Sequence, residues 1–239
     1  MRLLLLLVFS SVIAACGGGG DGSDGPPPLD DVNGIWREPA SETIGIISGD
    51  GSDVDIIRGC CTRLNGYLFA RQGHIYPSGL SQFVKSGPSG VCCCSYSGEG
   101  TVIPKAAIHA TYSDSSSGSK FTLDLTYDPI SNRQPSLDVI SGIWSQTTGD
   151  YTITITIDES GSLFGSDTNG CTYTGTVTVP DPSVATYKIH MGLGCFRDND
   201  GQGIIMDTVT DNDTFLFAVS GYLAGTILPF SFSDTLYRQ

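Results

Sequence analysis

The clearest pattern in this chain is the alternation of apolar and polar residues over short segments that end in turn residues. Phe121 to Tyr127 alternates without a break, and Tyr151 to Ile157 places four apolar side chains on one face and three threonines on the other. A period of two is typical of a β-strand with one buried face. Both segments therefore predict amphipathic strands.

Shorter apolar segments separated by Gly, Asp, Ser and Pro predict the other strands. In the first half of the chain the predicted strands cover residues 35–36, 43–48, 54–58, 64–71, 82–85, 91–96, 101–112 and 120–127. In the second half they cover residues 151–157, 162–165, 171–179, 184–193, 203–209, 214–219 and 222–232. Because the connections are short, strands that follow one another along the chain are expected to pair antiparallel.

One segment occurs twice and divides the chain into two similar modules. Leu29 to Trp36 reads LDDVNGIW, and Leu137 to Trp144 reads LDVISGIW. These segments contain the only two tryptophans of the protein. Repetition at this length predicts two copies of one structural unit. Each tryptophan opens its module, and we expect both to pack in a core rather than to serve as ligand platforms.

The strands and the repeat together indicate an all-β protein with two tandem domains. Module one is expected to span residues 29–128 and module two residues 137–239, with a proline-containing linker at 129–136. Eight short antiparallel strands with one apolar face can close into an up-and-down barrel or stack as a barrel-like sandwich. We favour two eight-stranded barrels, because no connection requires a long Greek-key crossover.

Composition supports this fold class and narrows the range of partners. The chain has 31 glycines in 239 residues, which is typical of short strands joined by turns. Its formal net charge is −13 at pH 7. A charge of this sign argues against nucleic acid and against anionic membrane surfaces as partners. Solubility is the simplest explanation of the acidic excess.

The N-terminal residues 1–15 have the composition of an export signal, with Arg2 followed by an apolar run and two alanines. Ile13-Ala14-Ala15-Cys16 resembles the lipobox of bacterial lipoproteins. The resemblance implies that Cys16 is acylated, with palmitate among its acyl chains, and becomes the mature N-terminus. Gly17 in place of aspartate implies, by the same resemblance, sorting to the outer membrane of a Gram-negative bacterium.

After the acylated cysteine, residues 17–28 consist of Gly, Asp, Ser and Pro and offer no apolar side chain to bury. Such a composition predicts a disordered tether between the lipid and the first module. We therefore assign residues 16–28 to the anchor and its spacer and leave them out of the fold.

The remaining cysteines are expected to form disulfides, because export places them in an oxidising compartment. In module two, Cys171 and Cys195 can pair with each other, unless one of them reaches across to module one. Closing the loop between them would stabilise the module by roughly 3 to 4 kcal/mol in the chain-entropy model.

Module one carries a doublet and a triplet at corresponding places: Cys60 and Cys61, and Cys92, Cys93 and Cys94. Successive side chains of a strand point to opposite faces, so the simplest arrangement is two bridges between the clusters with one thiol left over. A soft-metal site for Cu(I) or Zn(II) is the alternative, although no C-x-x-C spacing or adjacent histidine supports it.

Other candidate chemistry is sparse. The three histidines, His74, His109 and His190, fall in different predicted elements, and no nucleophile elbow or phosphate-binding loop accompanies them. We assign no catalytic residue and no cofactor. Asp198 and Asp200 lie in a segment that resembles the middle of a calcium loop, but Phe196 stands at the first ligand position, so a turn is the preferred interpretation and no metal is assigned.

The segments 121–129, 142–144, 152–158, 170–177 and 219–225 resemble the β-rich modules of Gram-negative surface lipoproteins. Those modules are similar in general form to lipocalin-like barrels and to the barrels of transferrin-binding-type lipoproteins. The resemblance implies a lipocalin-like barrel fold and attachment to the outer membrane, and leaves open whether the protein faces the cell surface or the periplasm.

From these observations we expect a non-enzymatic binding module at the cell envelope, anchored by its lipid and directed at a protein or other cell-surface partner. The segment Gly73 to Gly90 is expected to contain a long loop that makes module one specific. Two alternatives stay open: a structural accessory of an envelope assembly, and a carrier of a small hydrophobic ligand inside one barrel.

Overall fold

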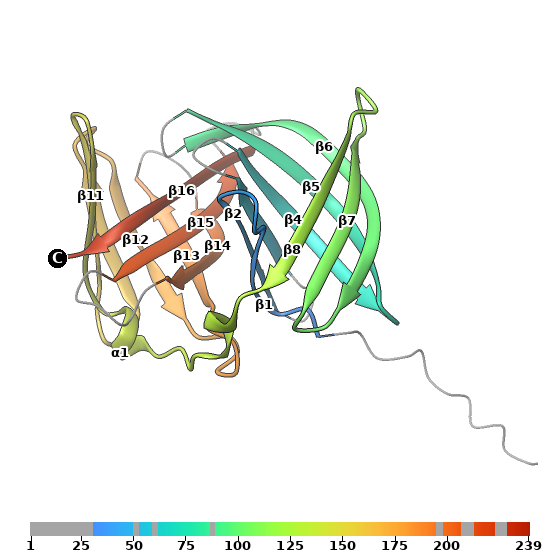
Figure 1. Ribbon diagram of the computed structural model, residues 1–239. Helices are drawn as coiled ribbons and strands as arrows, with labels where there is room; N and C mark the ends of the chain where they lie inside the picture. Colours follow the sequence, from blue (N-terminus) through green and yellow to red (C-terminus); the bar gives the residue numbers. More distant parts are fainter. Residues whose placement is uncertain are drawn as a thin grey trace, which may run out of the picture.

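The computed structural model describes residues 31–49, 53–58, 62–86, 89–194, 198–206, 213–222 and 229–239. In this part of the chain, sixteen antiparallel strands form two closed barrels of eight strands each (Figure 1). Helical structure in the described residues is limited to the 3₁₀ helix Pro129–Asn132 and to α1 (Leu137–Ile140), both between the barrels along the chain. The predicted all-β fold with two tandem barrels is confirmed.

Barrel one follows an up-and-down order, in which each strand pairs with its neighbour in sequence. Its strands are β1 (Gly34–Arg37), β2 (Thr43–Ser48), β3 (Asp53–Arg58), β4 (Thr62–Arg71), β5 (His74–Ser86), β6 (Ser89–Ile103), β7 (Ala107–Asp114) and β8 (Lys120–Tyr127). The barrel closes where β1 pairs with β8, with Trp36 opposite Tyr127.

Barrel two repeats this order. Its strands are β9 (Gly142–Thr148), β10 (Tyr151–Ile157), β11 (Ser162–Asp167), β12 (Thr172–Thr178), β13 (Tyr187–Leu193), β14 (Asp198–Ile205), β15 (Thr214–Tyr222) and β16 (Pro229–Arg238). The barrel closes where β9 pairs with β16, with Trp144 opposite Arg238.

The two copies of the repeated segment have the same local geometry. Trp36 and Trp144 are fully buried, and each indole Nε1 donates to the carbonyl oxygen four residues earlier, at Val32 (3.0 Å) and Ile140 (2.8 Å). Both tryptophans pack within the cores of their barrels. The expectation that they are core residues is confirmed.

The closing strand covers each tryptophan with a different side chain. The ring of Tyr127 meets Trp36 edge-on at 5.3 Å, whereas the guanidinium of Arg238 lies over the ring of Trp144 at 4.4 Å. Both contacts come from the residue that faces the tryptophan across the closing strand pair. The repeat in sequence is therefore also a repeat in structure, and the two copies differ in the side chain that contacts the tryptophan.

The predicted long loop between Gly73 and Gly90 is wrong, because β5 occupies most of this segment and pairs with both β4 and β6. A bulge obscured the strand pattern in the sequence: the β4–β5 register shifts between Asn65 and Tyr67, opposite Gly79, whose φ is 61°. An inserted residue reverses the alternation of inward and outward side chains, so a periodicity of two is lost across it.

A strand pairing and an apolar cluster contribute to the junction between the barrels. Strand β16 pairs with β6, so the two barrels share a continuous sheet. A separate buried cluster joins the outer faces of both barrels with the linker: Ile35, Ile46, Ile57, Ile130, Ala185, Ile204, Leu216 and Ala218. The two barrels are therefore in direct contact, through a shared sheet and a buried apolar cluster.

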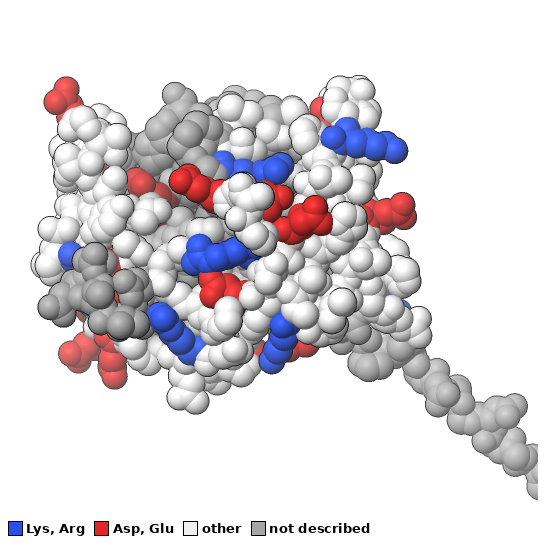
Figure 2. Space-filling model, in the orientation of Figure 1, with Lys and Arg blue, Asp and Glu red and all other residues white. Residues whose placement is uncertain are grey.

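The outer surface carries charges of both signs. On the face drawn in Figure 2, acidic and basic side chains are interspersed, so the acidic excess does not form a single patch there. Among the residues that the structure describes, none of the helices has the length and apolar character needed to span a membrane.

Candidate functional site

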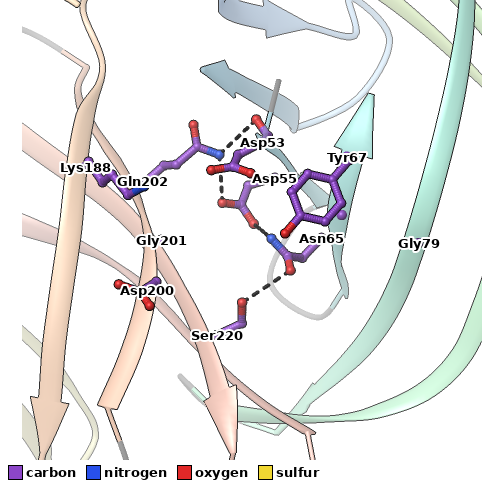
Figure 3. A pocket seen from close by; sticks show the side chains of 11 residues that line it. Asp53, Asp55, Asn65, Tyr67, Gly79, Lys188, Asp200, Gly201, Gln202 and Ser220 are labelled. Carbon is purple, nitrogen blue, oxygen red and sulfur yellow. Dashed lines mark hydrogen bonds between the residues drawn. The ribbon is translucent and has the colours of Figure 1, made fainter. Parts of the chain in front are cut away.

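A polar cleft of about 380 Å³ lies between the outer walls of the two barrels (Figure 3). Strands β3, β4 and β5 supply one wall and β13, β14 and β15 the other. The lining residues are Asp53, Asp55, Asn65, Gly66, Tyr67, Gly79, Lys188, Asp200, Gly201, Gln202 and Ser220. Ligand pockets commonly have volumes of roughly 300 to 1,000 Å³.

A buried ion pair underlies the cleft. The side chains of Asp55 and Arg63 point outward from barrel one, yet both residues are 0% exposed because barrel two covers them. Arg63 Nε donates to Asp55 Oδ1 at 2.8 Å, and Arg63 Nη2 also bonds this oxygen. Removing either charge would leave the other buried without compensation, which is strongly unfavourable.

The same arginine ties barrel one to barrel two. Its Nη1 donates to the backbone carbonyl of Val219 at 2.5 Å and to the hydroxyl of Ser231 at 2.7 Å. Arg63 therefore donates hydrogen bonds to β3, β15 and β16 simultaneously. A charged side chain that is held by several bonds in a covered position has little freedom to move.

Two side-chain amides extend the buried hydrogen-bond network under the cleft. We call this network the floor of the cleft. Gln202 of barrel two donates from Nε2 to Asp55 Oδ2 at 3.1 Å and accepts a bond from the Ser48 hydroxyl. Asn65 donates to Asp55 Oδ1 at 3.0 Å and accepts from the Ser220 hydroxyl at 3.2 Å. Figure 3 shows this network spanning the gap between the walls. The floor is thus preorganised by bonds between the barrels.

Above the floor, two charged groups of opposite sign face the cleft. Neither the carboxylate of Asp53 on barrel one nor the ammonium of Lys188 on barrel two has a hydrogen-bond or ion-pair partner among the described residues. Burial raises the pKa of Asp53, the charge of Lys188 opposes this rise, and the nearby carboxylates of Asp55 and Asp200 add to it. Asp53 is therefore a partly desolvated carboxylate without a compensating bond from the described part of the chain.

The backbone around Tyr67 leaves open space beside its ring. Tyr67 is 51% exposed and lies next to the bulge formed by Gly66 and Gly79. A Cβ atom on Gly66 would lie 2.8 Å from the carbonyl oxygen of Gly79, so a side chain at position 66 would collide with β5. Bulges frequently lie beside binding sites, where they redirect a side chain. Here the bulge leaves an aromatic ring beside a surface without side chains.

Asp200, which lines the cleft, forms a cross-strand pair with His190 on β13, with His190 Nδ1 2.9 Å from Asp200 Oδ1. A similar exposed pair, His109 and Asp124, lies on β7 and β8 of barrel one. His74 lies on β5 and opposes Thr101. The three histidines are distributed over different strands, as the sequence indicated, and among them only His190 contacts a residue that lines the cleft.

The two calcium candidates, Asp198 and Asp200, lie in the extended strand β14 and not in the turn that the sequence predicted. Their side chains point outward while that of Asn199 between them is buried. Among the described residues, no group of three or more His, Cys, Asp or Glu side chains could hold a metal ion. The two carboxylates do not converge on one point, because they follow each other along the outer face of a strand.

The predicted lipidation site Cys16 and the residues around it lie outside the described residues, as do Cys60, Cys61 and Cys195. Cys171 precedes β12, is buried, and is disulfide-bonded. Because its predicted partner Cys195 is not among the described residues, the pairing stays a prediction.

The cysteine triplet of module one lies on β6. The side chains of Cys92 and Cys93 are outside the described part of the structure, whereas Cys94 is a half-buried thiol beside the core of barrel one. The choice between bridges and a soft-metal site in this module therefore stays open.

No pattern in the sequence pointed directly to the cleft residues. One signal was present in β2 and β3, where Ile44 to Ile47 and Val54 to Ile57 place apolar side chains on both faces. A strand that is apolar on both faces is covered on both faces. Asp55 and, on the neighbouring strand, Arg63 project from this covered face, but the barrel that covers it could not be identified from one sequence.

No protein-family model, no curated protein and no solved structure matches this chain. The inter-barrel cleft and its chemistry are therefore the basis for the functional proposal.

Proposed function

We propose that this protein is a lipid-anchored, non-enzymatic binding protein of the outer membrane that holds its ligand or partner in the cleft between the two barrels. The lipobox-like sequence that ends in Cys16 and the tether that follows support the anchor. The rigid polar floor built on Asp55 and Arg63 supports a binding role, because it fixes the walls of the cleft before any ligand arrives.

The barrel interiors are less suitable as ligand sites than the cleft. Large side chains fill both, and the fully buried ones include Trp36, Tyr173, Phe215 and Phe217. This packing favours the cleft over a hydrophobic carrier role inside one barrel. The floor carboxylate of Asp55 is committed to bonds with Arg63, Asn65 and Gln202, which favours binding over acid–base chemistry.

Anchoring is tested by fractionating cells that express the wild-type protein or Cys16→Ser, with metabolic labelling by a palmitate analogue. We expect the label and outer-membrane fractionation in the wild type and neither in the variant. An unlabelled wild-type protein in the soluble fraction would refute the anchor.

Binding through the cleft is tested by photo-crosslinking on intact cells. A photoreactive phenylalanine analogue replaces Tyr67 in one variant and Tyr237, an exposed tyrosine at the far end of β16, in the matched control. We expect an envelope component to be captured from position 67 and not from position 237. Equal capture from both positions, or from neither, would contradict a cleft-based binding function, and turnover of the captured component would contradict a non-enzymatic role.

A further inference from the structure

We infer that the cleft binds a neutral saccharide, and that a row of exposed aromatic rings outside the cleft extends the site along an oligosaccharide chain. This inference rests on the proposed binding function and names the ligand class. It is carried by the charges on the two walls, by the exposed ring of Tyr67, and by the residues that follow Tyr67 on the outer surface of barrel one.

The walls carry charges of both signs, so a ligand with a single charge would meet at least one like charge. Asp53 and Asp200 would repel an anion, and Lys188 would repel a cation. A hydroxyl group can donate to a carboxylate and accept from an ammonium, so a polyhydroxylated neutral ligand satisfies both walls. Such a ligand would also supply the hydrogen-bond donor that the partly desolvated Asp53 lacks among the described residues.

The ring of Tyr67 provides an apolar surface beside these polar groups. It is half exposed, projects at the cleft in Figure 3, and lies next to the glycine bulge at Gly66 and Gly79. A sugar ring has an apolar face of C–H groups and a polar rim of hydroxyls, so it fits a flat aromatic surface bordered by donors and acceptors. A side chain on Gly79 would meet only the Tyr67 ring, at 4.0 Å, so its absence leaves room for a sugar ring there.

The aromatic surface continues beyond the cleft. Phe69 lies two residues after Tyr67 on the same outer face of β4, and its cross-strand neighbour on β5 is Tyr76. These rings are 40% and 54% exposed. Tyr76 in turn borders a second hollow of about 400 Å³ with polar groups from Glu99, His109 and Thr111. The rings therefore connect the polar cleft to a second, more apolar hollow along one wall, which fits a ligand with several sugar units.

Isothermal titration calorimetry on the full-length protein tests this inference. The probes are cellotetraose, maltotetraose and tetra-N-acetylchitotetraose, together with the corresponding disaccharides. Glycylglycine, putrescine and citrate represent a zwitterion, a cation and an anion. We expect at least one tetrasaccharide to bind, its disaccharide to bind more weakly, and the three small charged compounds not to bind.

The variants locate the site. Tyr67→Ala is expected to weaken tetrasaccharide binding at least about tenfold, whereas Tyr67→Phe keeps the ring and most of the affinity. Asp53→Asn and Lys188→Met should each weaken it about fivefold. Tyr76→Ala should weaken the tetrasaccharide and leave the disaccharide unchanged. The control Tyr237→Ala should have no effect on either.

Three results overturn the inference. Failure of every saccharide to bind refutes the ligand class, and saccharide binding that is equally insensitive to Tyr67→Ala and Tyr237→Ala refutes its location. If instead the dipeptide, diamine or citrate binds in a Tyr67-dependent manner, the saccharide class is wrong while the cleft remains a ligand site. If no probe binds and crosslinking from position 67 also captures nothing, the proposed function itself fails.

Discussion

At the scale of single residues, the buried ion pair of Asp55 and Arg63 stabilises the contact between the two barrels. Arg63→Ala should lower the free energy of unfolding by about 3 to 5 kcal/mol, because it leaves the Asp55 carboxylate buried without its cation. The measurement is the midpoint of urea denaturation. The exposed Arg71 at the end of β4 supplies the control, since Arg71→Ala should cost less than about 0.5 kcal/mol. Similar losses in both variants would show that the pair is not structural.

The contribution of Asp53 to the stability of the fold should depend on pH in the direction opposite to that of most carboxylates. Its pKa is raised in the folded protein, chiefly by burial, so the ionised form destabilises the fold. The contribution of Asp53 to stability is present at low pH and is lost as the pH rises through its raised pKa. We therefore expect Asp53→Asn to have a higher denaturation midpoint than the wild type at pH 7, and no advantage below the ordinary value of 3.8.

Asp158 is the matched control for this experiment, because its pKa is shifted in the other direction. Hydrogen bonds from the Ser160 side chain and the Ser162 backbone lower the pKa of this carboxyl in the β10–β11 turn. Its contribution is present at neutral pH and is lost on acidification through the lowered pKa. Asp158→Asn should therefore be less stable than the wild type at pH 7, and the deficit should shrink as the pH falls.

At the scale of elements, regular strands were predictable and interrupted ones were not. The alternation in β8 and β10 predicted both strands with their observed bounds, because nothing interrupts their pleat. Strand β5 was predicted only over residues 82–85, since Pro77 and Gly79 lie within its first half and the bulge reverses the inward face. Long-range pairing of β6 with β16 carries no local signature, so the joining of the barrels and the cleft beside it could not be predicted.

The bulge between β4 and β5 should be sensitive to any added side chain. In Gly66→Ala the new methyl group would lie 2.8 Å from the Gly79 carbonyl and 2.9 Å from the Leu80 Cα. Overpacking of this kind costs about 1 to 3 kcal/mol, and backbone atoms leave little room for relaxation. The measurement is the loss in the free energy of unfolding relative to the wild type. In the control Gly118→Ala, a turn glycine with φ 70° and open surroundings, only the conformational cost of about 1 kcal/mol should appear. A smaller loss at Gly66 than at Gly118 would argue against a tightly packed bulge.

At the scale of the whole molecule, the barrels should unfold together although each has its own core. The shared sheet, the apolar cluster around Ile46 and Leu216, and the bonds of Arg63 all cross between them. Each barrel contains one tryptophan, so Trp36→Phe leaves a fluorescent reporter in barrel two and Trp144→Phe leaves one in barrel one. Within each variant, the urea transition seen by fluorescence should coincide with that seen by circular dichroism, as cooperative unfolding requires.

Weakening the interface should separate these transitions. Leu216→Ala removes apolar contact only between the barrels, since the side chain belongs to the intervening cluster and not to either interior. Leu216→Ala is added to each single-tryptophan variant. It should lower the urea midpoint of the less stable barrel more than that of the more stable barrel, because the more stable barrel no longer supports its neighbour. Phe164→Ala, at an exposed site on β11, is the control and should leave the transitions coincident. If the fluorescence and circular dichroism curves already diverge without Leu216→Ala, the barrels are independent units, and the cleft between them would be held by its ligand and not by the fold.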